Sequence, residues 1–299
     1  MLRAGPHEKQ TPPAADAARW RLRDAVLDLT VPRIMAICNV TPDSFSDGGE
    51  HYSVDLALQF AAQAMRDGAT ILDIGGESTR PGATPVTVAM ELGRVLPVVE
   101  AVREQFPHLL ISIDTTKSVV ARACLAAGAN AINDVSAGRL DDAMFTVAAD
   151  TGAGLILMHS RGAVSDMATY GHAVYADDVM PAVCGELTAQ VERAFSAGVD
   201  HGAIVLDPGL GFSKTSDQSL TVLRELYRLV ALGFPVLVGA SRKRFIGELT
   251  GVSEPSQRVV GSVVAHALAV TRGAHLIRTH DVAATREALA VLAGTSAVT

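Results

Sequence analysis

Cysteine is scarce in this sequence. The three cysteines, Cys38, Cys124 and Cys184, are far apart, odd in number and without the short paired spacing of a zinc site. This usage excludes a cysteine-based zinc centre. It fits a reducing compartment, and we expect the protein to act in the cytoplasm.

A strongly basic segment is also missing. The chain has 25 Lys and Arg against 32 Asp and Glu, a net charge of -7, and no block of Lys or Arg that would follow a phosphate backbone. No apolar run approaches the length of a membrane span, and the first twenty residues lack the apolar core of a signal peptide. We therefore expect neither nucleic acid nor a membrane as a partner.

Apolar residues, in contrast, are abundant. They make up 48% of the 299 residues, which is enough to bury the core of one large globular domain. Residues 1–30 read as a flexible N-terminal extension, because they lack the regular pattern that follows. We expect residues 31–299 to form the single folded domain.

One pattern recurs about eight times after Pro32: a short apolar run rich in β-formers, a polar or Gly-containing loop, and a longer segment with helical spacing. Several helical segments end in Ala-Gly or Asp-Gly, which suits a left-handed C-terminal glycine. Eight such units match a (β/α)8 TIM barrel, and an open doubly wound sheet is the alternative. The apolar runs are residues 34–38, 70–76, 109–114, 130–135, 153–159, 203–209, 235–241 and 275–281.

Polar side chains follow almost every one of these runs, at the point where the strand should end. Side chains at the carboxyl ends of all eight strands meet only if the sheet closes, so their placement favours the barrel and one shared mouth. Helix N-capping is an alternative explanation for Asp114 and for one or two others, but not for a lysine, an arginine or a histidine. The residues are Asn39, Glu77, Asp114, Asn133, Asp134, His159, Asp207, Ser241 to Lys243, Arg278 and His280.

In this order, the strand-end motifs resemble those of the dihydropteroate synthase family, over residues 34 to about 292. The departures are small: Ala36 stands where the family usually has Gly, Cys38 where an aliphatic residue is common, and Thr279 where Val is usual. The motifs are "NVTPDSFSDGG", "DIGGESTRPGA", "SIDT", "INDVS", "LMH", "LDPGLGFSK", "GASRKRFIG" and "RTHDV".

The resemblance implies an enzyme of folate biosynthesis. Its members condense 6-hydroxymethyl-7,8-dihydropterin pyrophosphate with p-aminobenzoate, giving 7,8-dihydropteroate and pyrophosphate. In this scheme the C–O bond to pyrophosphate breaks first, leaving a stabilised cation that the arylamine attacks, and Mg²⁺ assists. Sulfonamides are the expected inhibitors.

A pterin ring needs buried carboxylate and amide groups at its amino-pyrimidinone edge, and Asp114, Asn133 and Asp207 are groups of that kind. By resemblance they bind the pterin, and Lys243 lies between the two substrates and contacts the pterin carbonyl side. Met158 and Phe212 would supply apolar walls, although ordinary core packing also explains Met158.

Arg278 and His280 have no neighbour in the sequence that could neutralise them except Asp281, and an uncompensated cationic pair at a barrel mouth suits an anion. We expect them to bind pyrophosphate, with Arg80 as a second cationic contact. The resemblance makes Asn39 the Mg²⁺ ligand, an oxygen donor for an ion that keeps most of its waters.

The polar segment "NVTPDSFSDGG" holds a lone aromatic, Phe45, in a loop with no apolar face, which suggests that the loop closes over a ligand. The resemblance implies that Phe45, Thr79 and Pro81, with Phe212, form the p-aminobenzoate site. It places Asp47 against the developing cation, so that Asp47, Lys243 and Asp207 form the catalytic group.

Two other functions share the pterin pocket: a pterin-dependent methyltransferase and a catalytically idle pterin-binding paralogue. The two loops and "SRKRF" argue against the methyltransferase, which has no arylamine site and no pyrophosphate to hold. Idle paralogues lose motif residues, and this chain retains five of them: Asp47, Asp207, Lys243, Arg278 and His280. The family also implies a homodimer, packed through residues 257–273, although burial within one chain would explain the apolar residues of that stretch equally well.

Overall fold

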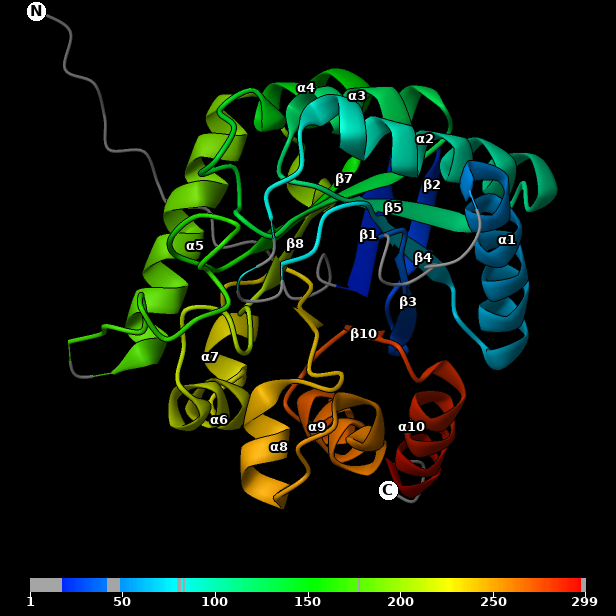
Figure 1. Cartoon of the computed structure of the whole chain (residues 1–299). Coiled ribbons are helices and arrows are strands. Elements are labelled where there is room, and N and C mark those ends of the chain that lie inside the picture. Colours follow the sequence, from blue (N-terminus) through cyan, green and yellow to red (C-terminus); the bar gives the residue numbers. More distant parts are fainter. Residues whose placement is uncertain (1–17, 42–48, 80–81, 83, 177, 297–299) are drawn as a thin grey trace, which may run out of the picture.

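The computed structural model describes residues 18–41, 49–79, 82, 84–176 and 178–296. Eight parallel strands form a ring with helices outside it (Figure 1). Hydrogen bonds run in the strand order β8-β7-β6-β5-β4-β3-β10-β9, and a parallel bridge between Leu206 and Val236 joins β8 to the residues just before β9. The ring therefore closes, which confirms the predicted (β/α)8 TIM barrel.

Each predicted apolar run overlaps one barrel strand. The strands are β3 (Arg33–Asn39), β4 (Ile71–Gly75), β5 (Leu110–Asp114), β6 (Ala131–Asp134), β7 (Gly154–Met158), β8 (Ile204–Asp207), β9 (Leu237–Val238) and β10 (Leu276–Thr279).

Helices follow the strands and begin and end where the local sequence favours it. Thr87 caps α2 by accepting a hydrogen bond from the Met90 amide at 3.3 Å, and Thr215 with Gln218 forms a capping box at α6. Gly128, after α3, has a φ of +112°, as the Ala-Gly ending predicts. The helices are α1 (Gly49–Asp67), α2 (Val88–Gln105), α3 (Ser118–Ala126), α4 (Met144–Thr151), α5 (Val179–Ser196), α6 (Ser216–Arg224), α7 (Tyr227–Val230), α8 (Arg244–Thr250), α9 (Val259–Thr271) and α10 (Val282–Ser296).

None of these helices, in the part of the chain that the structure describes, is long and apolar enough to cross a membrane.

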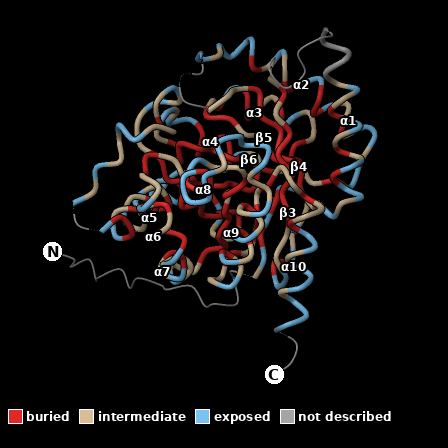
Figure 2. Tube along the Cα trace, turned by 60° about the horizontal axis from the view of Figure 1, so that its bottom comes forward, coloured by how far each residue is buried: buried red, intermediate tan, exposed pale blue. Residues whose placement is uncertain are grey.

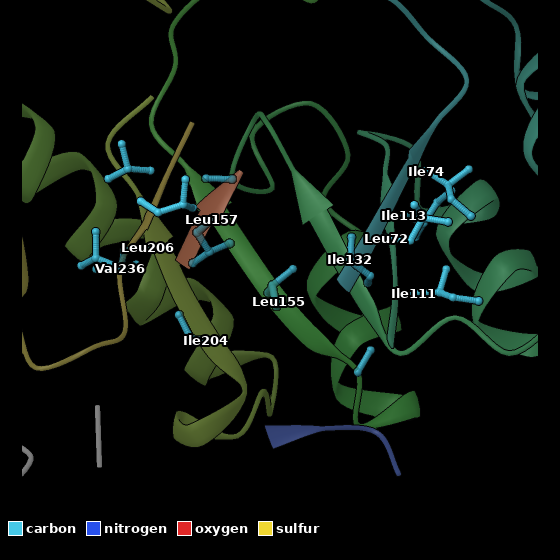
Figure 3. Close-up of a cluster of buried hydrophobic side chains, with 14 of the residues drawn as sticks. Leu72, Ile74, Ile111, Ile113, Ile132, Leu155, Leu157, Ile204, Leu206 and Val236 are labelled. Carbon is cyan, nitrogen blue, oxygen red and sulfur yellow. The ribbon is translucent and has the colours of Figure 1, made fainter. Parts of the chain in front are cut away.

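The strands alternate between two faces, and each face has its own core. Leu72, Ile74 and similar residues on neighbouring strands form the large cluster under the helices (Figure 3). The intervening positions point into the barrel: at the amino ends of the strands they are apolar, as with Met35 and Ile71, and at the carboxyl ends they are polar. The strands are accordingly the most buried part of the chain (Figure 2).

A β-hairpin closes the amino-terminal end of the barrel. Strands β1 (Arg19–Leu22) and β2 (Ala25–Asp28) pair antiparallel, and Trp20 is fully buried with its indole N–H donating to the Ala203 carbonyl at 2.7 Å. Trp20 and Leu22 pack with Met35, Ile71 and other inward residues at the amino ends of the strands.

The predicted flexible extension of residues 1–30 is therefore wrong for residues 19–28, because an open barrel end would expose this inner apolar layer. Residues 1–17 lie outside the described residues.

Replacing Trp20 with alanine should lower the free energy of unfolding by about 3–5 kcal/mol, because a buried indole leaves a cavity and the Ala203 carbonyl loses its donor. Urea denaturation measures the change. Val26→Ala, at an exposed position of the same hairpin, is the matched control. Equal stability of both variants would show that the hairpin does not plug the barrel.

Candidate active site

The carboxyl ends of the strands bring together most of the predicted polar residues at one mouth. The groups come from separate strands and from the start of α8, and nearly all are buried or half-buried. They are Asp114 at the end of β5, Asn133 on β6, Asp207 at the end of β8, Lys243 before α8 and Arg278 on β10.

Arg278 lies at the centre of this cluster. Its Nε donates to Asp73 Oδ2 at 2.6 Å and its Nη2 to Asp114 Oδ2 at 2.6 Å, with 20% of the Arg278 side chain exposed. The expectation that Arg278 lacks a neutralising partner is therefore wrong. Asp281, the neighbour in sequence, pairs with Arg242 instead at 2.6 Å, since the barrel places β4 and β5 nearer to the guanidinium.

Asp73 was missed by the sequence analysis and lies beneath the whole cluster. It is fully buried on β4, and its Oδ2 also accepts a hydrogen bond from Asn133 Nδ2 at 3.0 Å. A signal was present: Asp73 is the one charged residue in "TILDIGG", at an inward position of the strand. A buried carboxylate in an apolar run needs a cation, and Arg278 is that cation.

Two buried oxygens of the site have no hydrogen-bond partner among the described residues. They are Asp73 Oδ1 and the Ser112 hydroxyl, whose residues are neighbours in the register of β4 and β5. Buried polar atoms are normally paired, so this pair offers an acceptor and a donor to a ligand or an ordered water.

The carboxylates on the two sides of the mouth are both strongly desolvated. Burial raises the pKa of Asp114 to about 7, although the Arg278 guanidinium opposes that shift. Burial also raises the pKa of Asp207, against the opposing charge of Lys243, and Asp207 Oδ1 accepts from the Gly209 amide at 2.7 Å. Both groups can therefore bind a ligand that presents N–H donors.

Lys243 is held against a loop rather than in an ion pair. Its Nζ donates to the Leu210 carbonyl and lies 4.1 Å from the centre of the Phe212 ring. Burial lowers the pKa of Lys243 to about 7, with Asp207 acting in the opposite direction. The prediction that Lys243 is not an ordinary solvated lysine agrees with this environment.

An apolar wall lies beside these polar groups. Met158, at the end of β7, is buried with Val135 and Met167, and the half-buried Phe212 packs against them. This small cluster is separate from the two large ones and lies at the polar end of the barrel. A flat ring with a polar edge would therefore fit here, with its face against the apolar wall and its edge against the polar groups.

His280 and Asn39 lie at the rim: Asn39 ends β3, and His280 directly follows β10, the neighbouring strand. His280 Nδ1 is 2.9 Å from the Ser241 hydroxyl, which also accepts from the His280 amide at 3.1 Å. Asn39 is half-buried at the end of β3, which pairs with β10. No group of three or more His, Cys, Asp or Glu suited to a metal occurs in the described ranges.

The start of the loop after β4 is anchored by a lysine that the sequence analysis did not single out. Lys117 Nζ donates to Glu77 at 2.7 Å and to the fully buried Glu91 at 2.5 Å. Glu77 also accepts from the Val86 amide at 2.8 Å, so it joins the two ends of the loop that carries the half-buried Thr79.

Four predicted site residues, Phe45, Asp47, Arg80 and Pro81, lie outside the described residues.

Among the described residues, no cysteine thiol faces this mouth as a nucleophile. Cys38 is buried in the cluster under the helices, and burial raises the pKa of its thiol to about 12. The described polar groups of the mouth are carboxylates, an amide, a lysine and an arginine, which suit binding and polarising a ligand.

Comparison with known proteins agrees with the site. Residues 35–280 match the model of the pterin binding enzyme family. Curated dihydropteroate synthases of Mycobacterium leprae and Escherichia coli are each 44% identical, over 89% and 90% of this chain and 94% and 93% of their own lengths.

Solved structures give the same result. A Xanthomonas albilineans dihydropteroate synthase with 4-aminobenzoic acid matches with a TM-score of 0.87 and 47% identity, over 95% of this chain and all of that one. The same enzyme in complex with 7,8-dihydropteroate gives 0.84 and 44%, over 94% of this chain and 100% of that one. A Yersinia pestis enzyme with a sulfonamide drug gives 0.86 and 42%, over 94% and 100%. With these motifs on a closed barrel, the chain belongs to the dihydropteroate synthases of the pterin binding enzyme family.

Proposed function

We propose that this chain condenses 6-hydroxymethyl-7,8-dihydropterin pyrophosphate with p-aminobenzoate, forming 7,8-dihydropteroate and pyrophosphate. The observation that carries the proposal is the buried polar floor at the barrel mouth, in which Asp73 and Asp114 hold Arg278 beside an apolar wall. The related enzymes that hold 4-aminobenzoic acid and 7,8-dihydropteroate support it.

Asp207, Asn133 and Asp114 would hold the amino-pyrimidinone edge of the pterin. Asp207 keeps one oxygen on the Gly209 amide and has the other for ligand N–H groups. Asn133 donates to Asp73, which fixes its amide so that the oxygen can accept or its second N–H can donate. Met158 and Phe212, which belong to one apolar cluster, would form a wall for the ring, and Lys243 would contact its carbonyl side.

Pyrophosphate would lie at the rim beside β10. Arg278 uses Nε and one Nη2 bond for Asp73 and Asp114, and its remaining N–H groups can reach an anion. His280 and Arg80 would complete the contact. Holding the leaving group lets its bond to the pterin methylene break first, and the buried mouth excludes water that would compete with the arylamine.

Mg²⁺ fits the oxygen chemistry of Asn39 at this rim. One amide oxygen is a weak ligand set, which suits an ion held mainly by water and by the phosphates of the substrate. When bound, Mg²⁺ would neutralise charge on the departing pyrophosphate.

Thr79 and Phe212, with Phe45 and Pro81, would bind the p-aminobenzoate ring, and Asp47 would face the developing cation. Sulfonamides, which share the arylamine shape, would occupy the same place; the Yersinia pestis structure with a sulfonamide drug supports this.

We also propose a cytoplasmic homodimer that packs through α9. Val260, Val264 and Leu268 recur every fourth residue on this helix and are 78%, 54% and 44% exposed. Burial within one chain does not account for these three residues, so a second copy is the natural cover for the stripe. The free cysteines Cys38, Cys124 and Cys184 suit the cytoplasm.

The reaction itself is tested by pyrophosphate release. The purified chain should release pyrophosphate from the pterin ester with Mg²⁺. It should consume an equal amount of p-aminobenzoate as dihydropteroate forms, and chromatography measures both compounds. An idle paralogue would bind the ester without either product. A pterin-dependent methyltransferase would show methyl transfer instead, and either result would overturn the proposal.

Asp207→Asn should fold normally and lose most pterin affinity, by about 3 kcal/mol, because a charge-assisted hydrogen bond is lost and a ligand donor meets an amide N–H. Calorimetric titration with 6-hydroxymethylpterin measures the loss. Asp217→Asn, at an exposed position of α6, is the control. Unchanged affinity would mean that Asp207 serves only the turn to Gly209.

Substitutions of His280 and Arg278 should differ in which of two ligands they weaken. His280→Ala should weaken the pterin pyrophosphate ester about tenfold or more and leave the phosphate-free pterin nearly unaffected, because the anion contact is lost while Asp207, Asn133 and Asp114 stay in place. Arg278→Met should weaken both ligands, since Asp73 and Asp114 lose their shared cation and the pterin floor is rearranged. Titration of each ligand into each variant gives the comparison. Equal losses for His280→Ala would contradict a separate anion site.

A further inference from the structure

The loop between β8 and α6, residues 208–215, has an unusual backbone. Gly209, Gly211 and Ser213 have φ angles of +65°, +76° and +50°, so left-handed residues alternate along the loop. Ser213 carries a side chain, for which this region is unfavourable. Such a conformation persists only where surrounding contacts fix it.

A buried lysine supplies several of those contacts. Lys214 is fully buried, and its Nζ donates to the Gly209 carbonyl at 3.2 Å, the Phe212 carbonyl at 3.1 Å and His159 Nδ1 at 2.8 Å. All three acceptors are neutral groups. Burying an ammonium group without a carboxylate in contact is costly, and burial lowers the pKa of Lys214 to about 7.

His159 orients this lysine. Its Nε2 donates to Glu186 Oε2 at 3.1 Å, which leaves Nδ1 as the acceptor for Lys214. Burial lowers the pKa of His159 to about 4, so the ring is neutral and can keep both roles.

The same network returns to the loop by a second route. Glu186 pairs with Arg161, whose guanidinium lies 4.1 Å from the centre of the Tyr175 ring. Tyr175 in turn donates its hydroxyl to the Ser213 carbonyl at 2.9 Å, and the Arg161 amide donates to the Ser213 hydroxyl at 2.8 Å. The loop is thus tied to β7 and to the segment after it from two sides.

The same loop supplies the contacts of Lys243, the second lysine of the mouth. The Leu210 carbonyl accepts from Lys243 Nζ, and the Phe212 ring lies below that same atom at 4.1 Å. A Cβ added at Gly211 would stand 3.1 Å from Lys243 Cδ, so the Lys243 stem lies directly on the loop backbone. Lys214 donates hydrogen bonds to the carbonyls of Gly209 and Phe212, which lie before and after Leu210 and Gly211 in the loop.

We propose that Lys214 is a positioning residue for the reaction: it fixes residues 209–213 so that the Leu210 carbonyl and the Phe212 ring place Lys243 over the pterin site. The inference rests on the proposed role of Lys243 in pterin binding. Lys214, the last residue of "LDPGLGFSK", would therefore act through Lys243 and would not contact the substrate.

A double-mutant cycle tests the proposal. Lys214→Met removes the three donated hydrogen bonds and keeps an unbranched side chain, and Lys243→Met removes the group that Lys214 is inferred to place. Affinity for 6-hydroxymethylpterin is measured by calorimetry in the wild type, both single variants and the double variant. Circular dichroism confirms that each variant is folded.

If Lys214 acts through Lys243, Lys214→Met weakens pterin binding about tenfold when Lys243 is present and less than about twofold when it is absent, a coupling typical of residues in one network. Equal losses in both backgrounds would overturn the proposal, because a general loss of structure is additive. No loss from Lys243→Met alone would overturn the role of Lys243 itself, which separates the two failures.

Lys117→Met is the matched control. Lys117 is another lysine near the barrel mouth, but it is only partly buried and bonds to Glu77 and Glu91. Its effect on pterin affinity should add to that of Lys243→Met. Should Lys214→Met fail to fold, His159→Phe takes its place in the cycle, because it removes one acceptor and leaves the two carbonyl contacts of Lys214. The same coupling with a smaller loss is expected, and additivity would again reject the proposal.

Discussion

The ion pair of Arg278 with Asp73 and Asp114 is the interaction on which the mouth of this barrel depends. The guanidinium extends from β10 past β3 to carboxylates on β4 and β5, so it links strands that are not hydrogen-bonded neighbours. Asp73 could not remain fully buried without that cation. Through Asp73 the pair also fixes the Asn133 amide. The orientation of these polar groups at the mouth is therefore a consequence of one half-buried arginine.

The two ends of the barrel differ in what they contribute: the amino end adds stability, and the carboxyl end carries the polar groups of the site. At the amino ends of the strands, the inward residues are apolar and Trp20 covers them, which supplies dry packing. At the carboxyl ends, carboxylates and cations are packed together and two oxygens lack a partner in the described structure. A polar cluster of this kind contributes little to folding, so the packed end and the outer helix layer must hold the barrel closed.

The two lysines of the mouth illustrate how such a site is kept in place. Lys243 lies at the barrel mouth and contacts a loop carbonyl and a ring, both of which belong to residues 209–213. Lys214 lies beneath that loop, and His159 and Glu186 hold it in turn. Neither ammonium group has a carboxylate hydrogen-bonded to it among the described residues, which explains why burial lowers the pKa of each to about 7.

The sequence by itself determined the barrel, its eight strands and most of the described polar residues at the mouth, although not Asp73. Strand periodicity and polar residues at strand ends are local properties, and they survive in any closed arrangement of these units. Local pattern could not reveal the hairpin of residues 19–28, because the layer that buries Trp20 is assembled from all the strands. Nor could it pair Arg278 with Asp73: the two are 205 residues apart, and nearby Asp281 looked like the available partner. Only closure of the ring decides which charges meet, because that contact depends on strand neighbours in space and not on distance along the chain.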